Sequence, residues 1–144
     1  MAICDGPWTM TLVNDDGGKG SDIFVFKNIT VTGTTFTGEV FDRTGMGTRI
    51  SLLTGTCEDL ATGNPRLTRL TFQFRLPART GGEVGMFLAG VGFPPAMGNA
   101  QFLGRFRAYT PDRFTPSFDT AEALVIMLDV GDTGTGTGMQ ALPS

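Results

Sequence analysis

The chain has 144 residues, of which 40% are hydrophobic and 17% are charged, and its formal net charge is −3. That length suits one domain with one hydrophobic core, so we treat residues 1–144 as a single domain. The net negative charge provides no general attraction to phosphate backbones or anionic lipids, so we expect neither nucleic acid nor a membrane as partner. No apolar run approaches the roughly 20 residues of a membrane helix, and the N-terminus lacks a signal-peptide pattern, so we expect a soluble, cytoplasmic protein.

Short segments that alternate apolar and polar residues follow one another along the chain, separated by Gly, Pro, Asn and Asp. This spacing is typical of a β-sandwich or a β-barrel. The strands predicted in this way are Pro7–Val13, Asp22–Val31, Thr35–Asp42, Thr48–Cys57, Leu67–Leu76, Val84–Phe93, Gln101–Tyr109 and Ala123–Val130. Because the loops between them are short, each strand should pair antiparallel with its neighbour in sequence. Closure removes the exposed edges of such a meander, which favours an all-β, single antiparallel up-and-down barrel of about eight strands over two packed sheets.

The last third of the chain is harder to assign. Residues Thr110–Thr120 form a longer loop that could cover one mouth of the barrel. The segment Asp119–Leu128 could begin as a helix, but the apolar run within it favours a strand. That strand has no polar face, which predicts burial on both sides. We expect a homo-oligomer whose interface includes Val125 and Met127 or the opposite face of this strand, and the alternative is a helix that covers the barrel. The alternation of Gly and Thr within residues 131–144 is compatible with a flexible tail or with a final edge strand.

Two predicted strands, the fifth and the seventh, each have one polar face. These faces carry the candidate ligand-binding residues Arg69, Arg75, Arg105, Arg107 and Tyr109. If the polar faces point into the barrel, the arginines would line a cavity able to hold a carboxylate or a phosphate. If the faces point outward, the same residues are ordinary solvated side chains on a sheet surface.

Two aromatic residues complete the candidate site. Trp8 is the only tryptophan and opens the first strand, and Phe102 lies on the apolar face of the seventh. Trp8 could stack on a ligand at one end of the barrel, or it could fill that end as a core residue.

The residue types that are missing restrict the chemistry. The chain contains no histidine, which removes Ser-His-Asp and Cys-His machinery and the usual zinc ligand sets. No nucleotide-binding fingerprint, EF-hand or CxxC spacing is present, so we predict no metal and no cofactor. Catalysis by confinement in a pocket needs no titrating group and stays open. The two cysteines, Cys4 and Cys57, could form one bridge, although two free thiols are the simpler expectation.

Three phrases of the sequence resemble those of calycin-like meander barrels and, more distantly, of avidin-like proteins. The phrase Gly6-Pro7-Trp8 is similar to their opening Gly-x-Trp strand, and Phe36-Thr37-Gly38 and Leu53-Thr54-Gly55-Thr56 resemble later strands. The resemblance implies a small closed barrel that binds a small molecule. Avidin-like proteins enclose biotin with several strand tryptophans, and the corresponding strands here carry phenylalanines instead: Phe72, Phe74, Phe102 and Phe106. The resemblance therefore does not extend to biotin.

Three functions fit these observations. The first is a barrel that binds a small, largely apolar molecule, with an acidic group facing one of the arginines. The second is a cyclase or isomerase of natural-product biosynthesis that folds its substrate in the same cavity, with Thr110–Thr120 as a lid. The third is a structural or assembly protein of the virion type, which predicts a filled barrel with large subunit contacts.

Overall fold

The computed structural model describes residues 6–15, 21–59, 67–77, 81–93, 99–109 and 133–140. All regular structure in these ranges is β-strand, and none of it is a helix able to cross a membrane. The strands are β1 (Trp8–Asn14), β2 (Ser21–Thr32), β3 (Thr35–Phe41), β4 (Ser51–Asp59), β5 (Thr68–Pro77), β6 (Glu83–Phe93), β7 (Gln101–Tyr109) and β8 (Thr133–Gln140).

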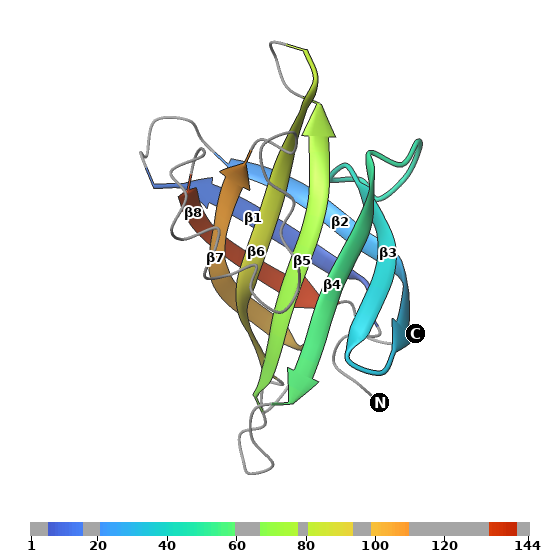
Figure 1. The fold of residues 1–144 in the computed structure, drawn as a ribbon, viewed down its shortest axis with the longest axis vertical. Helices are drawn as coiled ribbons and strands as arrows, with labels where there is room; N and C mark the ends of the chain where they lie inside the picture. Colours follow the sequence, from blue (N-terminus) through green and yellow to red (C-terminus); the bar gives the residue numbers. More distant parts are fainter. Residues whose placement is uncertain are drawn as a thin grey trace.

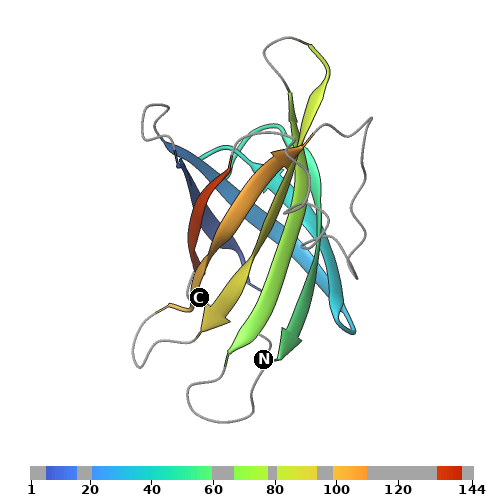
Figure 2. The same cartoon turned by 60° about the vertical axis from the view of Figure 1, so that its left-hand side comes forward.

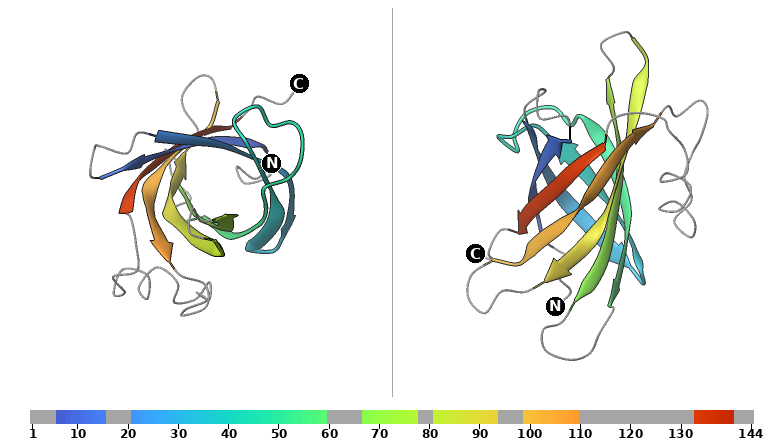
Figure 3. Two further views of the ribbon diagram at one scale, coloured as in Figure 1. Left: turned by 90° about the horizontal axis from the view of Figure 1, so that it is seen from above. Right: turned by 90° about the vertical axis from the view of Figure 1, so that its left-hand side faces the viewer.

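The strands form a closed barrel in which every neighbour in sequence is a neighbour in space. All pairs are antiparallel, and β8 closes the ring by pairing with both β7 and β1. Figure 1 shows the tilted strands, and the view from above in Figure 3 shows the ring. The predicted all-β, antiparallel up-and-down barrel is therefore confirmed. Below, the upper end is the end at which β5 and β7 finish in Figure 1, and the lower end is the opposite one.

The strand that closes the barrel differs from the predicted one. The predicted strand Ala123–Val130, its interface residues Val125 and Met127, and the loop Thr110–Thr120 all lie outside the described residues. The closing strand is β8, whose Gly-Thr alternation also allowed a tail or an edge strand. Because β8 is hydrogen-bonded on both sides, the interpretation as an edge strand is wrong, as Figure 2 also shows.

Side chains fill the interior of the barrel. Alternation along each strand places apolar residues inside, and Trp8, Phe26, Phe72 and Phe102 are fully buried there. The ring of Trp8 meets the rings of Phe72 and Phe102 edge-on, each with a centroid distance of 6.5 Å, and Phe72 lies 5.3 Å from Phe102. Trp8 is thus a core residue. An eight-stranded barrel is just wide enough for side chains to fill, which these rings do.

The inner face of β8 consists of Gly134, Gly136 and Gly138, followed by the buried Gln140 at the lower end. A Cβ atom at Gly134 would overlap both the ring of Phe106 and the backbone carbonyl of Val13. The glycines are needed because side chains from the neighbouring strands occupy the space next to them.

The expectation of two free thiols is wrong. Cys57, at the lower end of β4, is disulfide-bonded, and Cys4 is the only other cysteine of the chain. Spacing in the sequence could not reveal this bond, because pairing depends on which residues are neighbours in space. Structural disulfides are typical of oxidising compartments and rare in the cytoplasm. The cytoplasmic location stays a prediction, and this bond does not favour it.

Candidate ligand-binding site

The polar faces of β5 and β7 point outward. Arg69, Arg75 and Arg105 are exposed and Arg107 is half-buried, whereas the residues that alternate with them belong to the buried core. The arrangement in which these arginines line an interior cavity is therefore overturned. The physical reason is that the opposite faces of these strands carry phenylalanine and leucine. Burying these apolar side chains inside the barrel is favourable, and alternation then leaves the arginines outside.

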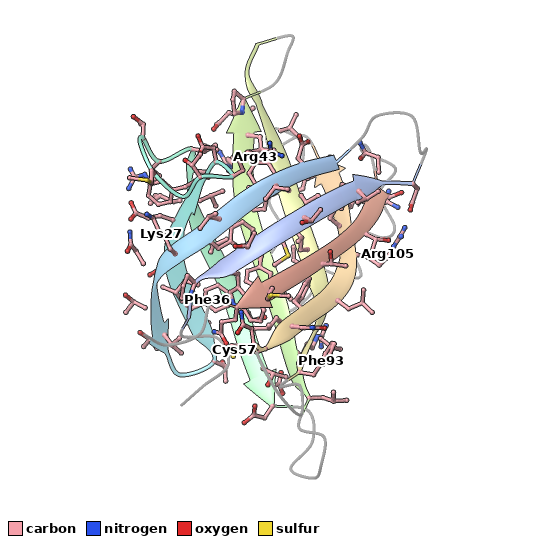
Figure 4. All side chains as sticks on the ribbon, turned by 180° about the vertical axis from the view of Figure 1, so that it is seen from behind. Lys27, Phe36, Arg43, Cys57, Phe93 and Arg105 are labelled. Atoms are coloured by element: carbon pink, nitrogen blue, oxygen red, sulfur yellow. The ribbon has the colours of Figure 1, made fainter. Side chains whose placement is uncertain are left out.

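Arg105 takes part in a surface clasp near the upper end of β8. Its guanidinium donates to both carboxylate oxygens of Asp15, at 3.0 and 2.5 Å, and Nη1 also donates to the Thr135 hydroxyl at 3.1 Å. The Thr133 hydroxyl donates to the same carboxylate at 2.8 Å. Hydrogen bonds from Arg105 and Thr133 lower the pKa of Asp15. Figure 4 shows Arg105 on the outside of the barrel. The clasp ties β8 to the end of β1 and leaves Arg105 occupied.

Two of the predicted residues, Arg75 and Tyr109, come together although they lie on different strands. Arg75 is paired with Gly85 on β6, and Gly85 is paired with Tyr109 on β7. A Cβ atom at Gly85 would overlap the Tyr109 ring, so the ring lies across Gly85 towards β5. The glycine thus lets an aromatic side chain reach over one strand.

Arg75 and Tyr109 line an open groove of about 580 Å³ on the outer wall, which we call the upper groove. Its lining consists of Arg49, Ile50, Ser51, Leu52, Thr54, Gln73, Phe74, Arg75, Glu83 and Tyr109. These residues come from the loop before β4, from β4 and β5, and from the upper ends of β6 and β7.

The upper groove carries two guanidinium groups and one carboxylate, that of Glu83. Gln73 Nε2 is buried and has no hydrogen-bond partner among the described residues. The Arg75 guanidinium is half-exposed and lies 3.5 Å from Glu83, a long contact for an ion pair. Arg49 is held by Glu39 at 3.0 Å, so Arg75 is the less engaged of the two cations.

Tyr109 is buried, and its burial raises the pKa of its hydroxyl, an effect that the charge of Arg75 partly offsets. The hydroxyl therefore stays protonated at neutral pH. Its ring provides an apolar surface beside Arg75, and the exposed side chain of Leu52 provides a second one.

A second open groove, of about 720 Å³, lies on the outer wall of β7, β8 and β1 at the lower end, and we call it the lower groove. It is lined by Thr9, Thr11, Phe93, Asn99, Gln101, Phe102, Leu103, Thr137, Gly138, Met139 and Gln140. None of these residues is charged. Phe93, labelled in Figure 4, marks the lower end of this wall.

The predicted site residues thus separate into groups. Trp8 and Phe102 are core residues, although Phe102 also lines the lower groove. Arg75 and Tyr109 share the upper groove, whereas Arg69, Arg105 and Arg107 line neither groove. Gln73 and Leu52 were missed. The polar face of the fifth strand already contained Gln73, and Leu52 lay in the predicted fourth strand beside it, but no signal singled out either residue.

Comparison with known proteins yields no match: no family model fits the chain, and neither the curated proteins nor the solved structures include a similar one. The class of the fold therefore stands on the strand order alone. It is a closed eight-stranded antiparallel up-and-down barrel, which is compatible with a calycin-like fold.

Proposed function

We propose that the protein binds a small, largely apolar molecule with an acidic group, and that this molecule lies in the upper groove on the outside of the barrel. The observation that carries the proposal is the set of donors there, Gln73 Nε2, Arg75 and Arg49, beside the apolar surfaces of Leu52 and Tyr109. Gln73 Nε2 has no hydrogen-bond partner among the described residues, and the contact of Arg75 to Glu83 is long, so these two donors favour a ligand that supplies acceptor oxygens, such as a carboxylate.

The packed interior supports an external site. The rings of Trp8, Phe72 and Phe102 occupy the middle of the barrel, where an internal ligand would have to lie. The same packing gives little support to a cyclase or isomerase, which needs interior space to fold a substrate.

The test uses octanoate as the probe and octan-1-ol as its neutral counterpart, each titrated calorimetrically. We expect octanoate to bind more tightly than octanol, and Arg75→Gln to weaken octanoate by roughly tenfold, because a charge-assisted hydrogen bond is lost. Arg69→Gln is the matched control, since Arg69 is exposed on the same face of β5 but lies outside the groove. Equal binding of acid and alcohol, or equal loss in both variants, would refute the proposal.

A second candidate is a structural or assembly protein, because such a protein has no need of a cavity and its barrel is expected to be filled. The packed interior favours this candidate as well. It is distinguished from the first by the octanoate titration, since an assembly protein has no reason to discriminate octanoate from octanol.

A further inference from the structure

The outer wall of β7, β8 and β1 presents an uncharged surface that is part apolar and part polar. Two rows of outward-facing side chains cross the three strands. They are Gln101, Met139 and Thr9 in one row and Leu103, Thr137 and Thr11 in the other. Leu103 is 54% exposed and Met139 is 50% exposed, although both are large apolar residues.

We infer that this wall is the face through which the protein associates with a second copy of itself. In a two-fold symmetric contact, a side chain near the axis meets its own copy. Threonine hydroxyls and glutamine amides each carry a donor and an acceptor, so they can pair with themselves. Leucine and methionine pair with themselves through apolar contact. A face made of these residues is therefore complementary to itself.

The charge pattern around the barrel favours this wall over the others. The core of a protein interface is depleted in charged residues, and none of the described residues that line the lower groove is charged. The upper groove is lined by three charged residues, Arg49, Arg75 and Glu83, which an interface core disfavours. The next row along the wall contains Arg105, held in its clasp with Asp15, and marks where the uncharged face ends.

The size of the face predicts a weak contact. The uncharged face takes in the five residues of β8 beyond the Arg105–Thr135 row, so three strands cover an area roughly 14 Å wide and 17 Å long. This is smaller than the roughly 800 Å² per partner of a standard interface, so we expect a reversible dimer.

The experiment is sedimentation velocity of the full chain from about 10 μM to about 1 mM, the range in which a weak interface assembles. We expect the mass to rise with concentration towards twice that of one chain. Leu103→Glu and Met139→Glu should each keep the protein monomeric, because they place like charges opposite each other. Leu52→Glu is the matched control, since Leu52 is 62% exposed on β4, across the barrel, and this variant should still dimerise.

A wild-type protein that stays monomeric at the highest concentration would overturn the inference. A dimer that survives Leu103→Glu and Met139→Glu would do so too. Each variant is compared with the wild type by its melting temperature, so that loss of the fold is not mistaken for loss of the contact. The upper groove and this face share no residue, so either proposal can fail without the other.

Discussion

Strands β5 and β8 make opposite contributions to the same core. β5 places Leu70, Phe72 and Phe74 in the barrel, all of them buried, whereas β8 faces the interior with glycines. β5 is therefore held by side-chain burial, and β8 by its backbone ladders to β1 and β7 and by the surface clasp of Arg105.

The difference teaches how a narrow barrel accommodates large aromatic rings. The large rings of Phe102 and Phe106 on β7 extend over the neighbouring strand β8. The space is free there because β8 has glycines at these positions. The Gly-Thr repeat that resembles a flexible tail in the sequence is thus matched to the rings of the neighbouring strands. The predictions below test the two ways of holding a strand, from the largest expected effect to the smallest.

The largest effect is expected from the β5 side of the core. Phe72→Ala removes a fully buried ring that contacts Trp8, Phe26, Phe36 and Phe102. We expect it to lower the free energy of unfolding by about 3–5 kcal/mol, as measured by denaturant titration. Exposed Leu103→Ala is the control and should change it by less than about 0.5 kcal/mol. A Phe72→Ala variant as stable as the control would mean that the interior is not tightly packed.

An intermediate effect is expected on β8, where adding a methyl group should destabilise. Gly134→Ala forces a Cβ atom against the Val13 carbonyl and the Phe106 ring, so we expect a loss of about 1–3 kcal/mol in the same titration. Gly136→Ala is the matched control. The nearest atoms to its Cβ would be the ends of the Leu88 and Leu12 side chains, at 3.1 and 3.3 Å, which can move aside, and the Phe102 ring at 3.8 Å, an ordinary contact. Equal losses in the two variants would indicate a generic cost of replacing glycine in this strand.

The smallest effect is expected from the clasp, because its groups are exposed to solvent. The pKa of Asp15 is lowered in the folded barrel, so the unfolded chain binds more protons in the acidic range. The contribution of the clasp is complete above the ordinary aspartate pKa of about 3.9, and it is lost as the pH falls through the folded-state value. Asp15→Asn should therefore slightly lower the melting temperature at pH 7, and the difference from the wild type should vanish in acid. A difference that stays constant with pH would show that the clasp does not stabilise β8.

The sequence predicted seven of the strands to within about three residues, because alternation and turn residues are local signals. It left β8 open between a flexible tail and a final edge strand, since a strand that places glycine inside and threonine outside has no apolar face to recognise. The upper groove was predictable only in part. Arg75 and Tyr109 were candidates from their strand faces, but their meeting depends on Gly85, a pairing partner of both. Leu52 and Arg49 lie in the predicted strand Thr48–Cys57, beside the fifth strand, but alternation alone does not show which of its side chains line a groove.

The central claim is that the interior is packed and the ligand lies outside, and the fluorescence of Trp8 tests it most directly. Trp8 is the only tryptophan and is fully buried among the core rings, inside the wall whose outer face carries the upper groove. We predict a short-wavelength emission that resists quenching by acrylamide and does not change when octanoate saturates the protein. Ready quenching by acrylamide, or an emission shift on octanoate binding, would place solvent or ligand inside the barrel and contradict the account.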